Sequence, residues 1–360
     1  MAGVSVLTLA LLSSCSIAFH HSSPKKANTQ NNLVGRNFLS GLPGVNGPVL
    51  SVKIDDTNSA HPQVGLRSAD VVYIEQVEGG LTRLNAVFTN SLPLRIGPVR
   101  SARISDIDIL SQYGHVAFAY SGAQTKFLPV IASSNLADLG AEHESSADYS
   151  RDTTRFAPYN LFLNPAHLLS QQSGIATVSQ PIWNFGDTSK IYSDTNSHVV
   201  TSVSLHWPSN GYKFKWVAKT NAWEMFYTKG NGYAPDVDEK GRNIYPSNLI
   251  IQYLSITPSI YSDREGGVTP LSHVVGSGVG YLLTSGRVVP ITWNRPDATS
   301  MTKYQLSNGS LVTLTPGRTW IALIDPTVDG PATFDPAIAT PAQSSNEKSV
   351  NNAQASTSSQ

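Results

Sequence analysis

The chain has 360 residues, with 25 Lys and Arg against 25 Asp and Glu, and charged residues make up only 14% of it. An average soluble domain carries about 25%. This neutral composition lacks the basic footprint of a nucleic-acid-binding protein and gives no electrostatic basis for docking on anionic lipid. A hydrophobic fraction of 40% excludes a wholly disordered chain. The single Cys excludes an intramolecular disulfide and a Cys-based zinc site.

The N-terminus has the features of an export signal. Residues 2–14 read AGVSVLTLALLSS, an apolar run that is short for a membrane span and fits the h-region of a signal peptide. The run ends in Leu12-Ser13-Ser14-Cys15, which resembles a bacterial lipobox. The resemblance implies cleavage of residues 1–14, diacylation of Cys15 and anchoring to the membrane at the bacterial cell surface. The alternative is an ordinary free or buried Cys in a cytosolic helix.

Polar segments flank the body of the chain. Residues 15–37 lack apolar periodicity and predict a flexible tether. Residues 330–360 are low-complexity and dotted with Pro, and they predict a disordered tail. The length between them suits two domains. We expect an N-terminal domain over residues 38–190 and a C-terminal domain over residues 198–329.

Strand and helix patterns alternate in the first half. Short β-rich runs occur at residues 49–54, 70–75, 84–88 and 115–120. Apolar spacing predicts helices over Ser101–Tyr113, with Ser101 as N-cap, and over Ala123–Ser133. A third helix is predicted after Asn164, with Pro165 at its first position. This interleaving predicts an α/β or α+β N-terminal domain.

The second half has a β-rich pattern. From about Val199, strand-like runs alternate with turns rich in Gly and Asn, and five of the six Trp lie there. The pattern predicts a mainly antiparallel β domain, a small sandwich or barrel. Trp223, Tyr227 and Tyr233 near Gly-rich turns could form a carbohydrate-stacking platform if exposed. Core packing is the alternative for each of these aromatic residues.

Several motifs of the body resemble one known family. They include VEGG at residues 77–80, IGPVRSAR at residues 96–103 and PGRTW at residues 316–320. On these motifs the chain resembles the YerB-like family of bacterial lipoproteins, a family of unknown function. The resemblance covers nearly the whole body and implies an α/β part followed by a β-rich part. Asp56 and His61 depart from the family's pattern, where Asn and Arg are more usual.

Acidic residues follow the predicted strands at their carboxyl ends. Asp55 and Asp56 follow the first run, and Glu75 and Glu78 close the second. Ligands of α/β sheets bind beyond the carboxyl ends of the strands. If these strands are parallel neighbours, their polar ends converge on one site.

Arginines gather in the same part of the sequence. Arg100 and Arg103 lie at the start of a predicted helix, whose free N–H groups favour anions, and Arg83 lies nearby, with Arg95 as a further candidate. Arginine forks suit a phosphate or carboxylate. The sequence thus predicts a pocket for a cell-wall glycan or anionic envelope polymer. The alternative is a buried network in which Arg100 and Arg103 pair with the acidic residues.

Two further functions stay open from the sequence. A hydrolase of envelope polymer needs two carboxylates about 5 to 9.5 Å apart, and Glu78 with Asp55 is the best pair. A non-catalytic scaffold for another envelope protein needs no site chemistry. No cofactor is expected, and no metal site either. Glu142, His143, Glu144 and Asp148 are metal-ligand types on one loop, but adjacent positions point apart, which favours a solvated loop.

Overall fold

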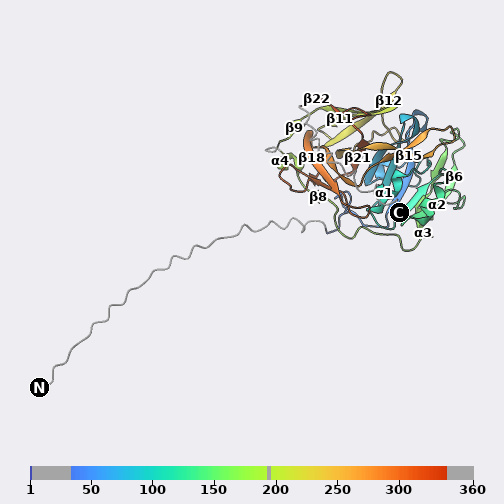
Figure 1. The fold of residues 1–360 in the computed structure, drawn as a ribbon, viewed down its shortest axis with the longest axis horizontal. Helices are drawn as coiled ribbons and strands as arrows, with labels where there is room; N and C mark the ends of the chain where they lie inside the picture. Colours follow the sequence, from blue (N-terminus) through green and yellow to red (C-terminus); the bar gives the residue numbers. More distant parts are fainter. Residues whose placement is uncertain (2–33, 193–195, 339–360) are drawn as a thin grey trace, which may run out of the picture. The chain divides into compact units, whose positions relative to one another are not determined.

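The computed structural model describes Met1 and residues 34–192 and 196–338 (Figure 1). The predicted signal peptide, Cys15 and most of the predicted tether lie outside the described residues. Residues 339–360 of the predicted tail also lie outside them. No helix among the described residues is long and apolar enough to cross a membrane.

A large mixed sheet joins strands from both halves of the chain. A short strand, β9 (His198–Val199), pairs with one of its outer strands. In spatial order the others are β19 (Lys303–Gln305), β18 (Arg287–Arg295), β17 (Gly276–Thr284), β14 (Asn248–Tyr253), β21 (Thr319–Ile324), β2 (Val71–Gln76), β3 (Thr82–Phe88), β1 (Leu50–Asp55), β4 (Ala117–Tyr120) and β5 (Ala137–Gly140).

Seven strands of this main sheet run in the same direction, and one of them, β18, is separated from β14 by the antiparallel β17. β14, β21 and β2 are parallel neighbours, and so are β1, β4 and β5. Between the two groups, β3 pairs antiparallel with both β2 and β1. The carboxyl ends of β1, β2, β4 and β5 therefore meet at one edge of the sheet, together with the start of β3.

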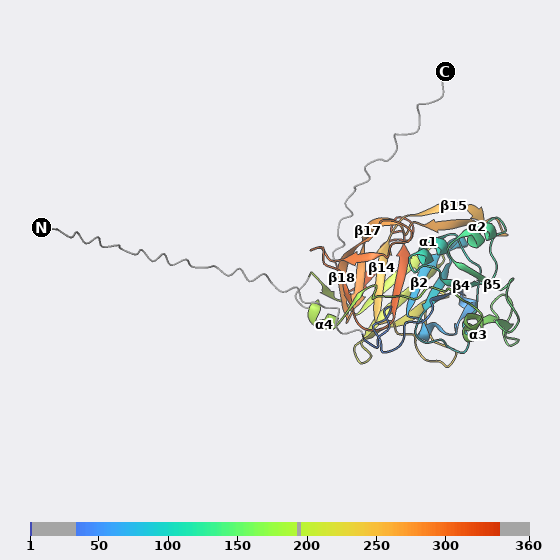
Figure 2. The same cartoon turned by 90° about the horizontal axis from the view of Figure 1, so that it is seen from below.

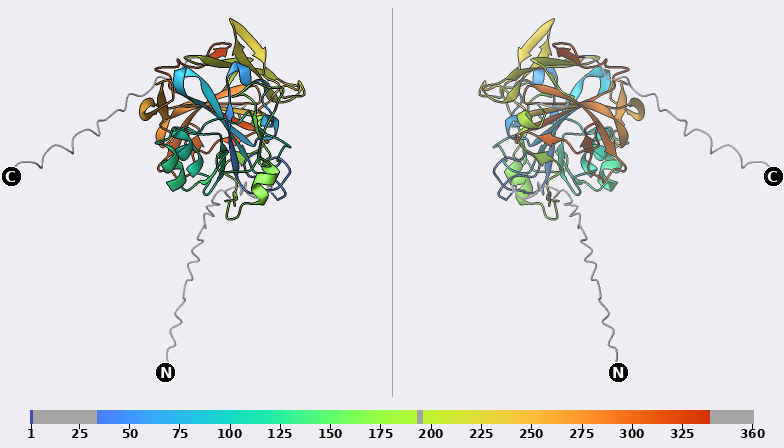
Figure 3. Two further views of the ribbon diagram at one scale, coloured as in Figure 1. Left: turned by 90° about the vertical axis from the view of Figure 1, so that its right-hand side faces the viewer. Right: turned by 90° about the vertical axis from the view of Figure 1, so that its left-hand side faces the viewer.

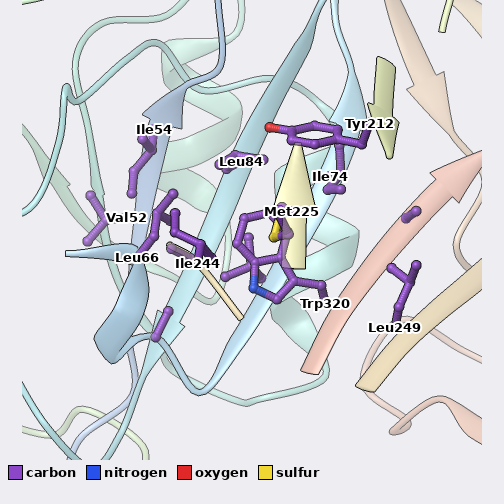
Figure 4. Packing of buried hydrophobic residues seen from close by; sticks show 14 of the residues in the cluster. Val52, Ile54, Leu66, Ile74, Leu84, Tyr212, Met225, Ile244, Leu249 and Trp320 are labelled. Carbon is purple, nitrogen blue, oxygen red and sulfur yellow. The ribbon is translucent and has the colours of Figure 1, made fainter. Parts of the chain in front are cut away.

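One face of the main sheet packs against a second, five-stranded sheet. Alternate side chains such as Ile54 of β1 and Leu84 of β3 form this core with Tyr212, Met225 and Trp320 (Figure 4). Because successive side chains of a strand point to opposite faces, one set of apolar residues serves this interface. The second sheet has the order β13 (Gly232–Pro235), β12 (Ala222–Lys229), β11 (Asn210–Val217), β10 (Ser202–Trp207) and β22 (Thr333–Asp335).

The other face is covered by short helices and loops. Ile109 and Leu110 of α1 pack with Phe118 of β4 and Ile321 of β21 in a second core. Figure 2 shows α1 and α2 on the same side of the sheet as the β15 strand. The helices are α1 (Ser105–Ser111), α2 (Leu128–Ser133), α3 (Pro165–Ser170) and α4 (Thr188–Ile191), with 3₁₀ turns at Asn58–Ala60, Leu66–Ser68 and Glu78–Gly80.

Three two-stranded pairs complete the described part of the fold. In Figure 3 the yellow β12–β13 hairpin of the second sheet projects from the rest of the molecule. The pairs are β15 (Ile256–Ser262) with β16 (Val268–Ser272), β6 (Tyr149–Arg151) with β7 (Leu161–Leu163), and β8 (Asn184–Phe185) with β20 (Thr313–Leu314).

The helix predictions are confirmed in part. α3 begins as predicted, and the Asn164 side chain accepts a hydrogen bond from the His167 N–H. α1 starts at Ser105, not Ser101, and α2 starts at Leu128. The early start of α1 is wrong because the segment before Ser105 bonds to other parts of the chain. The Ala102 N–H donates to the carbonyl of Gly122, after β4, at 3.0 Å.

The fold is mostly β, and the second half does not form a sandwich or barrel of its own. Its strands β14, β17, β18, β19 and β21 join the main sheet, while β10–β13 form the second sheet with β22. β22 lies within the predicted disordered tail, which is wrong for that stretch. Phe334 of β22 is buried in the core between the sheets, and β22 pairs with β10.

Candidate functional site

A cleft of about 860 Å³ lies at the edge where the parallel strands end. Asp55 ends β1, Glu78 follows β2, Gly122 follows β4 and Glu142 follows β5, and all four residues line it. This is the edge that the sequence indicated. Its volume falls in the range of about 300–1,000 Å³ that is typical of ligand pockets.

The structure brings five of the predicted site residues together in this cleft. We call them the cleft floor, and they are Asp55, Glu78, Arg83, Arg100 and Arg103. Two acidic candidates, Asp56 and Glu75, do not line the cleft.

Arg100 and Arg103 each form an ion pair across the cleft floor. The Arg100 Nε lies 2.5 Å from the Asp55 Oδ2, and the Arg103 Nη2 lies 2.7 Å from the Glu78 Oε2. The Thr57 N–H also donates to the Asp55 Oδ1 at 2.8 Å. Both carboxylates are almost fully buried, whereas the Arg100 side chain is 25% exposed. The pairs predicted for a structural network are therefore present, but they line an open cleft.

Burial and ion pairing act in opposite directions on Glu78. Burial alone would raise the pKa of its carboxyl. The hydrogen bond and charge of Arg103, with a hydrogen bond from the Thr269 hydroxyl, outweigh burial and bring that pKa below its ordinary value. Glu78 is therefore ionised at neutral pH.

Arg83 has no such partner. It is the second residue of β3, in register with Asp55 of β1 on one side and Glu75 of β2 on the other. Its Nη1 donates to the carbonyl of Ser101 at 2.8 Å. No ion pair involves Arg83 within residues 34–192 and 196–338. Burial, with the charges of Arg103 and Arg100, outweighs the charges of Asp55 and Glu78 and lowers the pKa of Arg83 to about 9, so Arg83 stays cationic at neutral pH.

The turn that carries Glu78 is shaped by its two glycines. Gly79 and Gly80 have φ values of 68° and 69°, a region that favours Gly. A Cβ on Gly80 would lie 2.5 Å from the Cβ of Pro208. The Ser209 N–H donates to the Gly80 carbonyl at 2.9 Å. The glycines of this turn thus allow a close approach to the loop between β10 and β11.

The β15–β16 hairpin forms one wall of the cleft. Thr269 of β16 donates to Glu78, and the Ser272 N–H donates to the Ser105 hydroxyl at 3.0 Å. The rings of Tyr261 and Phe127 lie 5.3 Å apart. The sequence analysis missed this wall. Its only local signal is the turn from Asp263 to Gly267 between two short strands, which says nothing of where the hairpin packs.

Asp56 lies in a different, buried cluster because its side chain points away from that of Asp55. Its carboxylate accepts hydrogen bonds from Thr82, Tyr212 and Asn210, the last at 3.1 Å. Burial raises the pKa of Asp56 to about 6. Asp56 therefore does not line the pocket in which the sequence analysis placed it. It links β1 to the second sheet instead.

Glu75 does not line the predicted pocket either, because it is fully buried beneath the cleft floor. It pairs with the ammonium group of Lys53, which lies 2.6 Å from the Asp106 Oδ1. Burial and the nearby charge of Asp106 raise the pKa of Glu75. The sequence analysis passed over Lys53. Its position inside the apolar run 49–54 was a usable signal, since a buried Lys needs a partner.

The remaining candidates lie outside the cleft. Trp223 is fully buried and Tyr227 nearly so, so they provide no exposed stacking platform, whereas Tyr233 is 40% exposed on β13. Arg95 pairs with Asp152 and Glu239 and does not line the cleft.

The metal-ligand side chains of the loop from Glu142 to Asp148 do not all lie together. Glu142 lines the cleft, while Asp148 pairs with His167 at 2.7 Å. No group of three or more His, Cys, Asp or Glu among the described residues could hold a metal ion.

The fold and the cleft define a mostly β protein built from two joined sequence halves, with an arginine-lined cleft at the sheet edge. The family described as "Protein of unknown function (DUF3048) N-terminal domain" matches residues 39–176, and its C-terminal counterpart matches residues 203–321. The chain belongs to this family.

Two comparisons with the YerB protein of Bacillus subtilis agree with this family assignment. The chain is 23% identical to the protein named "Putative lipoprotein YerB" over 281 residues, which is 76% of this chain and 80% of that protein. It is also similar to the crystal structure of the YerB protein, with a TM-score of 0.66 and 20% identity. That match covers 83% of this chain and 99% of the solved one, and it supports the fold.

Proposed function

We propose that this protein is anchored by a lipid at Cys15 on the bacterial cell surface and binds an anionic group of a cell-envelope polymer in its cleft. The lipobox and the lipoprotein name of the Bacillus subtilis relative support the anchor. The ligand is either a cell-wall glycan that carries acidic groups or an anionic polymer.

The unpaired cation Arg83 is the observation that carries the binding proposal. Arg83 is 9% exposed and lines the cleft, yet its side chain forms no ion pair with a carboxylate among the described residues. A charge held away from water without a partner is costly. An anionic ligand group bound in the cleft would supply that partner.

Binding is favoured over hydrolysis by the state of Glu78. The general acid of a glycosidase needs a raised pKa so that it holds a proton at neutral pH. The pKa of Glu78 is lowered by Arg103, and Asp55 is held by Arg100. Both carboxylates act here as partners that orient arginines.

A sedimentation experiment tests the proposal. Full-length protein in nonionic detergent is mixed with isolated bacterial cell walls, and pellet and supernatant are analysed by gel and mass spectrometry. We expect the protein in the pellet without released fragments, and about tenfold weaker binding for Arg83→Gln. Arg95→Gln, which removes an arginine outside the cleft, is the matched control.

Other outcomes would replace the proposal. Released wall fragments would assign a hydrolase and bring attention to Glu78 and Asp55. A protein that stays in the supernatant without releasing fragments would favour the scaffold, with another envelope protein as its partner. Equal binding by wild type and Arg83→Gln would remove the cleft floor from the site.

A further inference from the structure

The charges of the cleft floor do not cancel. Three guanidinium groups, on Arg83, Arg100 and Arg103, face two carboxylates, on Asp55 and Glu78, which leaves one positive charge in excess. This count indicates how much charge a bound group should carry.

The nitrogen atoms without a partner on the floor belong to two arginines. Each nitrogen of Arg103 has one, because Nε and Nη2 contact Glu78 and Nη1 donates to the Ala102 carbonyl at 2.9 Å. Arg100 contacts Asp55 through Nε, and among the described residues its two terminal nitrogens have no hydrogen bond. Arg83 uses only Nη1 in that part of the chain. A ligand therefore meets two separate guanidinium groups.

We infer that the group bound on the cleft floor is a singly charged phosphodiester that accepts hydrogen bonds from both Arg83 and Arg100. The inference rests on the proposed function and names the chemical class of its ligand. One negative charge neutralises the floor. A phosphomonoester, with a charge of about −1.5 to −2 at neutral pH, would exceed the positive charge available beside two buried carboxylates.

The number of donors separates a phosphodiester from a carboxylate. The two oxygens of a carboxylate lie in one plane and match the fork of a single arginine. A phosphodiester is tetrahedral, so each of its two non-bridging oxygens can face a different guanidinium group. Its two ester oxygens continue into substituents, which the cleft of about 860 Å³ has room to hold.

The rim of the cleft indicates that one such group binds at a time. Arg151 and Arg264 lie there among the acidic residues Glu142, Asp263 and Glu265. These two positive and three negative charges do not extend the positive floor into a track for a polyanion. The cleft therefore suits one phosphodiester unit, either inside a polymer or at its end.

Calorimetric titration of the full-length protein in nonionic detergent tests whether the cleft floor prefers a singly charged group. The probes are glycerophosphoglycerol as diester, glycerol 3-phosphate as monoester and glucuronate as carboxylate. At about pH 7.5 we expect the diester to bind about tenfold more tightly than either of the others. At about pH 5 the monoester becomes singly charged, since its second pKa is about 6, and its affinity should approach that of the diester.

Variants of the floor arginines test the two-donor geometry. Arg83→Gln and Arg100→Gln should each weaken diester binding about tenfold, while Arg95→Gln should not change it. Arg83→Lys keeps the charge without the fork and should give an intermediate loss. Thermal unfolding of each variant shows whether it is folded, and Arg83→Lys decides the question if a Gln variant is not.

Two sources of phosphodiester are separated by competition. A short poly(glycerol phosphate) chain and micelles doped with phosphatidylglycerol are compared as competitors for bound glycerophosphoglycerol. Competition by the polymer alone assigns a wall polymer, and competition by the micelles assigns a lipid headgroup. Either result supports phosphodiester recognition when Arg83→Gln weakens binding of the competitor about tenfold.

The failures can be told apart. If glucuronate or the dianionic monoester binds best at about pH 7.5, or no probe binds, the phosphodiester inference is overturned. The polymer-binding proposal then still stands where the protein sediments with cell walls. If the protein does not sediment with walls, that proposal itself fails.

Discussion

The carboxylate of Asp106 accepts a hydrogen bond from the backbone N–H of Arg103 at 2.6 Å, and its other oxygen lies 2.6 Å from the buried ammonium group of Lys53. The Asn85 side chain donates to Asp106 as well, at 2.9 Å. A buried charge cluster therefore lies directly beneath the cleft and holds the segment that carries its arginines.

Replacement of Lys53 should break this support. Lys53→Met leaves Asp106 buried without a cation, and we expect a loss of about 3–5 kcal/mol in unfolding free energy. Glu75→Gln is the matched control. Burial raises the pKa of Glu75, and an amide of the same shape replaces its carboxyl, so the loss should stay under about 1 kcal/mol at neutral pH. Similar losses in denaturant titrations of both variants would contradict this assignment.

A second buried cluster links the first half of the chain to the second sheet. The ring of His61 stacks on Tyr227 with centroids 3.7 Å apart. Its Nδ1 lies 3.3 Å from Asp236, and its Nε2 lies 3.7 Å from Asp56. Burial lowers the pKa of His61, but the hydrogen bond and charge of Asp236, with the charge of Asp56, outweigh it and raise that pKa above 6.5.

This cluster should make stability depend on pH. The folded state holds the His61 proton more tightly than the unfolded state, so this contribution is complete below pH 6.5 and is lost as pH rises through the raised pKa. The raised pKa of Asp56, about 6, adds a loss of the same sign between pH 3.8 and about 6. Unfolding free energies from about pH 6 to 9 should fall less steeply for His61→Gln than for wild type. Parallel curves would exclude His61 as the titrating group.

Arg83 should limit the stability of the unliganded protein. Arg83→Met removes a buried cation without an ion-pair partner, so we expect an unchanged or higher melting temperature together with loss of binding. Arg100→Met instead leaves the carboxylate of Asp55 unpaired and should cost about 3 kcal/mol. A marked loss of stability in Arg83→Met, measured by calorimetry, would mean that Arg83 is structural.

Glu78 offers a test of the charge balance in the cleft. Glu78→Gln raises the excess on the cleft floor from one positive charge to two, while an amide oxygen still accepts from Thr269. We expect the monoester to gain about tenfold relative to the diester in the same calorimetric titration. An unchanged order of affinities would show that charge does not select the ligand.

The two glycines of the Glu78 turn should differ in their tolerance of Ala. Both have positive φ, which costs about 1 kcal/mol for Ala. A Cβ on Gly79 meets no neighbour within 4 Å, whereas a Cβ on Gly80 collides with Pro208. Gly80→Ala should therefore lose about 1–3 kcal/mol more than Gly79→Ala in chemical denaturation. Equal losses would mean that the β10–β11 loop shifts without cost.

The location of the cleft could be predicted from sequence because it depends on local signals. Asp55 and Glu78 follow apolar runs that end as strands, and parallel strands bring such ends to one edge. α3 was predictable because Asn164 and Pro165 are a local capping signal.

Other features depend on contacts between distant residues, which no local pattern specifies. Thr269 reaches Glu78 only because the β15–β16 hairpin folds over the cleft, and β21 pairs with β2 across most of the chain. The pairing of Lys53 with Asp106 is of the same kind. The ion pairs that leave Arg83 without a partner also join residues far apart in the sequence, so the charge excess of the cleft floor was not predictable.

The position of β21 in the main sheet has a consequence for how the chain is made. β21 lies between β2 and β14, in parallel register with both, and it is among the last strands to be synthesised. Until β21 pairs with it, β2 keeps an open edge with unsatisfied backbone groups. We therefore expect the chain to be prone to aggregation until β21 is in place, and a holding chaperone should raise the yield of the folded protein.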